Sequence, residues 1–399
     1  MTASTERPPS GDEQTGEGTG GPLGADWRAR AQREQRAAVP AGRVAVSCSA
    51  PLGKGGLGRH LGEILAALER GGARASCICG STRASAPAPS GGGAPGDWRD
   101  AGVARLTGWL ARLPGASPGL RTRGFLAEFD AFAARRLPAA EHLIAFNSQA
   151  LLQLRAARGA GYESLILVSA NSHLRRVARQ HERARARYPL EGSWTAHLVG
   201  RNLAEYELAE RIHVASGYIR ESFLAEGVAE EKLVDFPLTP DPRYTPGERA
   251  GGPPGTGTFD VVYVGSLAVH KGVPLLIDAF RRVEHADMRL VLVGGWSTRG
   301  MRRFVQRACA ADSRIVAGAG DPLPALRRAR LCVHAAYEDG FGYAPAEALA
   351  CGVPLLVSED TGMRELIGGP SQGLVLPTGD LEALSESLDA AYRGEILGG

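Results

Sequence analysis

The feature that most constrains the fold is a strand, a glycine-bearing loop and a helix start in close succession near residue 340. Residues 329–335 form an apolar run that predicts a buried strand. The next segment, residues 338–348, reads Glu-Asp-Gly-Phe-Gly-Tyr-Ala-Pro-Ala-Glu-Ala. Proline is favoured in the first turn of a helix, so Pro345 predicts a helix that begins close to it. A helix N-terminus is therefore expected just after a buried strand.

Two acidic residues bracket this loop. Asp339 precedes the glycines, and Glu347 lies just inside the predicted helix. Between them, Gly340 and Gly342 leave backbone N–H groups open to a ligand, next to the positive end of the helix dipole. Amides suit phosphates and carboxylates suit hydroxyl groups, so the spacing predicts a site for a sugar diphosphate. A helix start with a chance glutamate would explain the glycines but not both acids.

The same segment resembles the Glu-x7-Glu signature of family 4 retaining glycosyltransferases, the group 1 enzymes of the two-domain GT-B fold. Asp339 takes the place of the first glutamate in that signature, and Glu347 is the second. The resemblance implies that Asp339 contacts a hydroxyl of the donor sugar and that Glu347 holds the nucleotide ribose. It also implies that the intervening loop of Gly340, Phe341 and Gly342 binds the donor.

Length and composition exclude several classes of protein. The 399 residues suffice for two ordinary domains, and a formal net charge of +3 is too small to indicate a nucleic-acid partner. No uninterrupted run of 18 apolar residues is present, and the first residues lack the pattern of a secretory signal. The six cysteines lie mostly in apolar runs, which predicts buried, reduced thiols. We therefore expect a cytoplasmic protein.

Composition also predicts the domain organisation. Residues 1–40 are rich in Gly, Pro, Thr, Glu and Arg and predict a disordered tail. Alternating strand and helix patterns predict Rossmann-like domains over residues 41–236 and 258–399, joined by a Pro/Gly-rich linker over 237–257. The resemblance makes the first the acceptor domain and the second the nucleotide-sugar donor domain. The expected fold is α/β of the GT-B type, with two doubly wound parallel sheets facing each other across a cleft.

A second glycine loop, Gly-Lys-Gly-Gly-Leu-Gly over residues 53–58, precedes a predicted helix in the first half. It fits G-x-G-x-x-G, but a dinucleotide site needs an acid about 20 residues further on, and residues 77–81 contain none. A P-loop is excluded because Lys54 is followed by glycine rather than Ser or Thr. The loop is similar to the turn that opens family 4 glycosyltransferases, which implies that Gly56 and Arg59 approach the donor phosphates.

Residues 264–272 resemble the family's Gly-Arg-x4-Lys-Gly loop, which grips the donor diphosphate. Gly265 and Lys271 match, and Lys271 supplies the cation that a diphosphate needs. Ser266 stands where the family usually has arginine. The resemblance extends to Gly362, in a loop that commonly offers backbone amides to the sugar or phosphate.

His173 follows the predicted strand over residues 164–169 and resembles the family's acceptor-side histidine, which lies near the reacting sugar. A lone histidine is about as often structural, so both interpretations stand. The six arginines between Arg175 and Arg187 form a basic run. A solvated helical face is its simpler explanation. The alternative is a platform for an anionic acceptor or for phospholipid, with peripheral contact at the inner membrane face.

The resemblance implies retaining sugar transfer from a nucleotide sugar to a glycan, lipid or small-molecule acceptor, with Asp339, Glu347, His173 and Lys271 as catalytic residues. No Asp-x-Asp motif occurs, so we expect neither a metal site nor a cofactor. Lys271, backbone amides and helix termini would then stabilise the leaving diphosphate. Two alternatives remain: a nucleotide-sugar epimerase or phosphorylase of the same fold, and a weakened sugar-nucleotide-binding subunit, suggested by Ser266 and Asp339.

Overall fold

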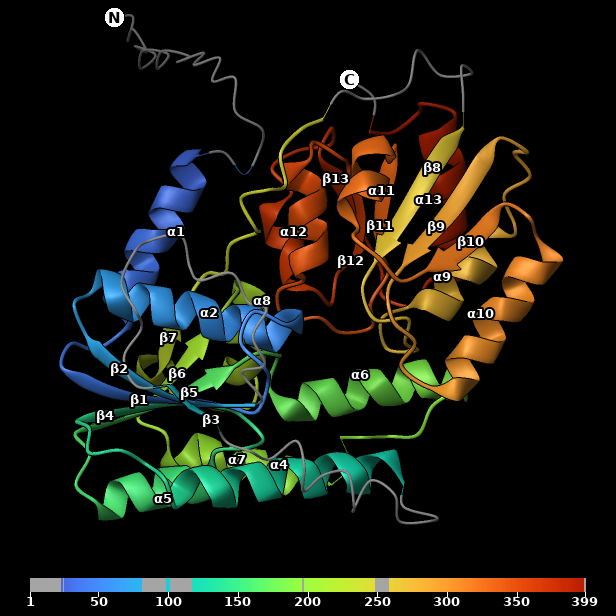
Figure 1. Cartoon of the computed structure of the whole chain (residues 1–399). Helices are drawn as coiled ribbons and strands as arrows, with labels where there is room; N and C mark the ends of the chain where they lie inside the picture. The colour runs from blue at the N-terminus through green and yellow to red at the C-terminus, as the bar shows by residue number, and fades with distance from the viewer. Residues whose placement is uncertain are drawn as a thin grey trace, which may run out of the picture.

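The computed structural model of the chain describes residues 23, 25–80, 98–100, 117–195, 197–247 and 258–397. These residues form two α/β domains, each built on one parallel sheet with helices on both faces (Figure 1). The predicted α/β fold with two doubly wound parallel sheets is confirmed.

The first sheet has seven strands in the order β3-β2-β1-β4-β5-β6-β7. Its central strands are buried on both faces, which explains their nearly continuous apolar sequences. The strands are β1 (Arg43–Cys48), β2 (Arg74–Cys79), β3 (Trp98–Asp100), β4 (His142–Phe146), β5 (Ser164–Ser169), β6 (Arg211–Val214) and β7 (Leu233–Asp235). The helices are α1 (Ala25–Ala38), α2 (Gly55–Arg70), α4 (Pro118–Ala134), α5 (Leu151–Gly159), α6 (Leu174–Arg187), α7 (Val199–Leu208) and α8 (Gly217–Leu224).

The second sheet has six strands in the order β10-β9-β8-β11-β12-β13. They are β8 (Phe259–Val264), β9 (Met288–Val293), β10 (Ile315–Gly318), β11 (Leu331–His334), β12 (Leu355–Ser358) and β13 (Gly373–Leu376). The helices are α9 (Val273–Phe280), α10 (Arg299–Ala311), α11 (Leu323–Arg328), α12 (Tyr343–Ala350) and α13 (Leu381–Tyr392). The strand order reverses between β1 and β4 and between β8 and β11. Loops after these strands flank the crevice in which open α/β sheets bind ligands.

The predicted disordered tail over residues 1–40 is wrong for residues 25–38, which form α1. Ala31 and Gln35 of this helix are buried. The Gln35 side chain donates hydrogen bonds to Glu63 and to the Pro237 carbonyl. Contacts with distant segments therefore order a stretch that has few large apolar residues of its own. Residues 1–22 and 24 of the predicted tail, the Ser/Pro/Gly-rich stretch over 81–96 and linker residues 248–257 lie outside the described residues.

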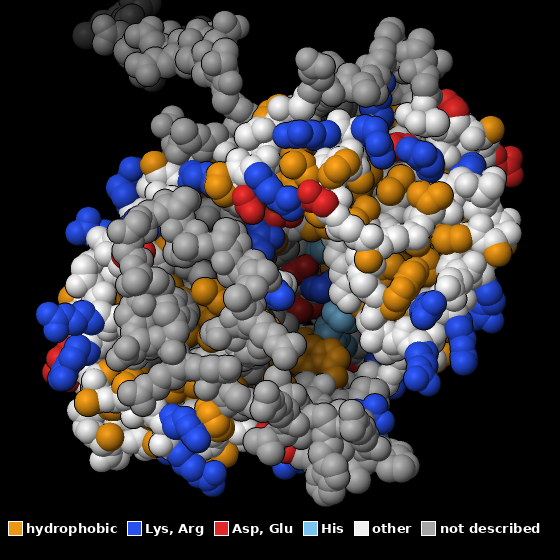
Figure 2. All heavy atoms as spheres, viewed as in Figure 1, with side chains coloured by type: hydrophobic (Ala, Val, Ile, Leu, Met, Phe, Trp, Pro, Cys, Tyr) orange, Lys and Arg blue, Asp and Glu red, His pale blue; other side chains and the backbone are white. Residues whose placement is uncertain are grey.

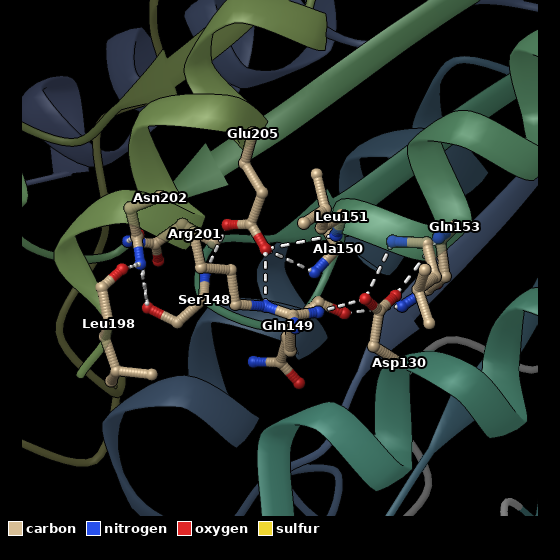
Figure 3. Close-up of polar contacts among 12 residues, drawn as sticks. Asp130, Ser148, Gln149, Ala150, Leu151, Gln153, Leu198, Arg201, Asn202 and Glu205 are labelled. Atoms are coloured by element: carbon tan, nitrogen blue, oxygen red, sulfur yellow. Dashed lines mark hydrogen bonds and ion pairs between the residues drawn. The ribbon is translucent and has the colours of Figure 1, made fainter. Parts of the chain in front are cut away.

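Buried carboxylates fix the loop between β4 and α5 (Figure 3). Glu205 of α7 accepts hydrogen bonds from the backbone N–H groups of Ser148, Ala150 and Leu151, at 2.6 to 3.1 Å. Within the same loop, Gln149 Oε1 accepts from the Ser49 N–H at 2.6 Å. Ser49 directly follows β1, so this network helps to fix the end of that strand.

The two domains are in close contact through α6, which extends from the first domain beneath the second (Figure 1). Gln180 Nε2 donates to Asp360 at 2.6 Å, and Arg187 donates to the Gly379 carbonyl at 2.7 Å. At the end of the helix, the Tyr188 hydroxyl donates to Asp278 at 2.8 Å. No helix within the described ranges combines the length and hydropathy needed to cross a bilayer.

Candidate active site

Lys271 and Asp339 form an ion pair at the carboxyl edge of the second sheet. Lys271 Nζ lies 2.9 Å from Asp339 Oδ2 and donates to the Glu338 carbonyl at 3.2 Å. His334, the last residue of β11, places Nε2 2.9 Å from the same Asp339 oxygen. Burial raises the pKa of Asp339. The charge of Lys271 and the hydrogen bond to His334 lower it by more than burial raises it, so the pKa lies below the ordinary value. Asp339 is thus held as a carboxylate.

A second ion pair joins the two domains. Arg59 of α2 places Nη1 2.6 Å from Oε1 of Glu347, which lies on α12. The Arg59 side chain is 28% exposed and that of Glu347 only 4%. The guanidinium also lies 4.0 Å above the ring of Tyr343, the first residue of α12. Burial raises the pKa of Glu347, while Arg59 opposes this shift. The predicted cations and carboxylates are therefore brought together in pairs.

The glycines around α12 have distinct structural roles. Gly342 precedes the helix with φ of +81°, a conformation that glycine adopts without strain. A Cβ on Gly340 would lie 2.8 Å from the Ala170 carbonyl oxygen of the first domain, and one on Gly362 would lie 2.2 Å from the Gly340 oxygen. The Gly362 N–H donates to the Asp339 carbonyl at 3.0 Å. In this arrangement Gly362 permits close packing of two loops, and its amide is already bonded. Phe341 between the glycines is buried.

The first glycine loop leads directly into α2, which begins at Gly55. Gly55 and Gly56 are exposed, and a Cβ on either would meet open space. A Cβ on Gly58 would instead lie 2.0 Å from the Pro51 carbonyl oxygen, so this glycine is required by a tight turn. The first N–H groups of a helix have no partner within it, so Gly55 and Gly56 add donors on the Arg59 side of the crevice.

Contacts from both domains fix the loop that carries Lys271. The Ser266 carbonyl accepts a hydrogen bond from the Tyr263 hydroxyl at 2.8 Å, and the Ser266 residue is exposed. Gly265 has φ of +144° and donates its N–H to Val293. His270 stacks on His181 of α6 with 4.3 Å between ring centroids. The lysine therefore projects from a well-supported loop.

His173 is not brought into this cluster. Its imidazole is 1% exposed and packs against Tyr206 and Phe223 in the first domain. The side chain caps α6 by accepting from the Arg175 N–H. Burial lowers the pKa of His173 to about 4, so the ring is neutral near pH 7. Of the two interpretations left open by the sequence, these contacts favour the structural one.

The basic run on α6 is not a free cationic face. Arg175 and Arg179 both pair with Glu226, at 3.1 and 2.8 Å. Arg183 and Arg187 donate to the carbonyls of Thr378 and Gly379 in the second domain. Most of these charges are thus engaged by the protein itself, and two of them hold the domains together.

The sequence analysis missed three residues near the cluster. Glu338 is buried beside Asp339 and accepts from Ser172 through its backbone N–H and its hydroxyl, at 3.1 and 3.0 Å. His334 ends an apolar strand, where a polar residue could have been noticed. Glu63 receives donors from residues up to 280 positions away in sequence, and no local pattern predicts that.

The cluster lies between the two domains. Figure 2 shows a hollow there in which acidic, basic and histidine side chains gather. Two cations, two carboxylates and two helix N-termini converge, which suits a ligand with a diphosphate and several hydroxyl groups. Over the part of the chain described, no three His, Cys, Asp or Glu side chains gather in a way that could hold a metal ion.

Solved structures of other proteins share this two-domain fold. Sucrose-phosphate synthase from Thermosynechococcus elongatus superposes with a TM-score of 0.65 at 18% identity, over 88% of this chain and 90% of that one. The HepE protein of Anabaena, in complex with UDP and glucose, gives 0.56 at 15% identity, over 88% and 90%. The fold is accordingly the GT-B fold of glycosyltransferases.

A family model matches the second domain. Residues 248–397 match the family model described as Glycosyl transferases group 1. O-antigen chain mannosyltransferase B of Escherichia coli is 30% identical over 132 residues, 31% of this chain and 34% of that protein. The chain spans between a third and two fifths of the length of the curated relatives it matches. The domain that carries Lys271, Asp339 and Glu347 is thus similar to group 1 glycosyltransferases.

Proposed function

We propose that this chain is a retaining glycosyltransferase that moves a sugar from a nucleoside-diphosphate sugar to a hydroxyl acceptor without a bound metal. Two ion pairs carry the proposal: Lys271 with Asp339 in the second domain, and Arg59 of α2 with Glu347 of α12 across the two domains. Three of these residues lie in the segment that matches group 1 glycosyltransferases. A diphosphate sugar presents the anionic and hydroxyl groups that such a set recognises.

In the proposed reaction the bond between the sugar C1 and the diphosphate oxygen breaks while the acceptor oxygen bonds to C1 on the same face. The acceptor proton passes to the departing diphosphate. Lys271 and Arg59 turn from their carboxylates to the diphosphate, and they and the helix N-termini stabilise its developing charge. Asp339 accepts a hydrogen bond from a sugar hydroxyl and Glu347 from the ribose. No side-chain nucleophile is required.

Two considerations support the donor class and the absence of a metal. A structural neighbour was crystallised with UDP and glucose, and a curated relative is named as a mannosyltransferase. The sequence has no Asp-x-Asp motif with which to hold Mg²⁺ or Mn²⁺ against the phosphates. Charge compensation in the proposed mechanism therefore falls to side chains and amides.

The test is a panel of UDP-, GDP- and ADP-sugars incubated with purified protein in excess EDTA, with nucleoside diphosphate release followed over time. We expect turnover of at least one donor, and proton NMR of the product should show the anomeric configuration of the donor. An inverted product contradicts retention. A loss of more than about tenfold in EDTA that Mg²⁺ restores contradicts metal independence. Isomerisation of the donor would indicate a nucleotide-sugar epimerase instead. Donor binding without turnover would indicate a sugar-nucleotide-binding subunit.

We further propose that the second domain contacts an anionic membrane surface at the cytoplasmic face through α10. Arg299, Arg302, Arg303 and Arg307 are exposed on this helix, which contains no acidic residue. Figure 2 shows basic side chains over this part of the molecule. Three of them lie near the positive end of the helix dipole, where cations are unfavourable unless an anion binds. Co-sedimentation with phosphatidylglycerol vesicles should fall when three arginines become glutamine; unchanged binding would refute this surface.

A further inference from the structure

One carboxylate on α2 connects four segments of the molecule. Glu63 Oε2 accepts hydrogen bonds from Gln35 Nε2 of α1 at 2.8 Å and from both the N–H and the hydroxyl of Thr239 at 2.9 Å. Its other oxygen, Oε1, accepts from the Tyr343 hydroxyl at 2.7 Å. Thr239 lies in the segment between the domains, and Tyr343 is the first residue of α12 in the second domain. Glu63 thus joins α1, α2, the linker and α12.

The contact between Glu63 and Tyr343 belongs to a paired arrangement on the two helices. Arg59 and Glu63 are four residues apart on α2, and Tyr343 and Glu347 are four residues apart on α12, so each pair shares a helix face. Glu63 binds Tyr343, Arg59 pairs with Glu347, and the Arg59 guanidinium also lies over the Tyr343 ring. The first two turns of α12 are therefore linked to the second and third turns of α2 by two contacts.

The first turns of α2 and α12 direct unpaired N–H groups at the crevice, and these contacts set the position of one helix relative to the other. A diphosphate gripped from both sides requires a fixed separation between the two sets of donors. Glu63 is an acceptor and is not one of the groups that would bind the diphosphate. Burial raises the pKa of Glu63, while the donated hydrogen bonds oppose this shift. Four donors to two oxygens match the acceptor capacity of an ionised carboxylate.

We propose that Glu63 is a positioning residue for the donor: by holding the Tyr343 hydroxyl, it fixes the N-terminus of α12 against the body of α2, so that the first turns of both helices can bind one diphosphate. The inference rests on the proposed function. Glu63 acts through Tyr343 and Arg59 and does not touch the donor. The alternative is that Glu63 only stabilises the linker through Thr239.

Two variants separate these roles, because each removes one O–H donor from the same carboxylate. Tyr343→Phe breaks the bond to the second domain and keeps the aromatic ring beneath Arg59. Thr239→Val breaks the hydroxyl bond to the linker and leaves the Thr239 N–H bond in place. Dissociation constants for UDP and GDP, measured by calorimetry on the full chain, are compared among the wild type and both variants, with melting temperatures as the control for folding.

We expect Tyr343→Phe to raise the dissociation constant of the preferred nucleoside diphosphate about tenfold, with the donor KM rising in parallel and kcat changing less than about twofold. Thr239→Val should change the dissociation constant less than about twofold. If both variants weakened nucleoside diphosphate binding equally, the contact between Glu63 and α12 would have no special role, and the positioning role would be overturned. Unchanged binding by Tyr343→Phe would overturn the positioning role.

Hydrogen–deuterium exchange gives a readout that does not depend on turnover. Without ligand, Tyr343→Phe should speed amide exchange at the start of α12 and in residues 55–59, and Thr239→Val should not. Wild-type exchange rates in Tyr343→Phe would contradict the link between the helices. A wild type that binds neither UDP nor GDP refutes the proposed function and the positioning role with it. A wild type that binds, with Tyr343→Phe binding equally, refutes only the positioning role.

Discussion

Asp339 depends on its neighbours for its charge. The side chain is one methylene shorter than the glutamate of the signature it resembles, and both Lys271 and His334 reach the same oxygen. This pairing lowers the pKa of Asp339 in spite of burial. The departure from the signature is therefore accommodated locally, and it gives no reason to regard the site as inactive.

The Arg59–Glu347 pair should respond unequally to loss of either partner. Glu347 is almost fully enclosed and Arg59 is more exposed, so removing the arginine leaves a buried charge without its counter-ion. We expect Arg59→Met to lower the free energy of unfolding by about 3 kcal/mol, and Glu347→Gln by about 1 kcal/mol. Urea unfolding of both variants measures this difference. Equal losses would mean that Glu347 has another partner or reaches water.

At the scale of elements, the carboxylates that cap α5 form an extended polar network in the first domain (Figure 3). Asp130 accepts from the backbone N–H groups of Leu152 and Gln153, and Glu205 accepts from three others. Arg201 pairs with both carboxylates. One guanidinium thus bonds to two buried carboxyl groups that together hold the start of one helix. Burial raises the pKa of both groups, that of Glu205 to about 7, and the charge of Arg201 opposes the shift.

Replacing that guanidinium should be costly. Arg201→Met leaves Asp130 and Glu205 close together without a cation, and we expect it to destabilise the protein by about 3 to 5 kcal/mol. Thermal unfolding of this variant should be compared with that of Arg158→Met, which removes an exposed arginine from α5. Similar melting temperatures for the two variants would contradict the role given to Arg201.

Two buried histidines near α2 and β6 predict a pH dependence of stability. His60 and His213 both stack on Phe236, and burial lowers their pKa values to about 3 and about 4. Between about pH 6.5 and 4 the unfolded chain binds protons that the folded protein excludes, so folding stability is lost as the pH falls through this range.

The slope should approach about 1.4 kcal/mol per pH unit for each histidine, and it should vanish above about pH 7. Urea unfolding at pH 7.5, 6.5, 5.5 and 4.5 measures it, and His213→Asn should make it shallower. A free energy of unfolding that stays constant down to pH 4.5 would show that these imidazoles can be protonated in the folded state.

Sequence patterns predicted the elements better than the contacts between them. A continuous apolar run predicted β5 with the observed bounds, because a buried parallel strand is specified by its own residues. The helix α1 escaped prediction because its order comes from Glu63 and Pro237, which are distant in sequence. The site divides in the same way: Lys271, Asp339 and Glu347 carry local motifs, whereas Glu63 is recognisable only from its contacts.

At the scale of the whole molecule, carboxylates of the second domain fasten the two halves together. Glu365 accepts from the N–H groups of Gly217 and Tyr218 at the start of α8, and Glu338 accepts from Ser172. Residues more than 140 positions apart form no local sequence motif. Two facing domains could therefore be predicted from the sequence, but the residues that join them could not. These contacts hold the two domains on either side of the cleft.

The central claim is that this cleft holds a donor diphosphate against Lys271 during sugar transfer. Its most direct test is kcat for the preferred nucleotide sugar, at saturating acceptor, in the wild type and in Lys271→Ala. Because a cation that stabilises developing charge in an enclosed site contributes several kcal/mol, we predict a fall in kcat of about 100-fold or more. Lys271→Arg should restore part of it. A Lys271→Ala protein with near-normal kcat would contradict the claim.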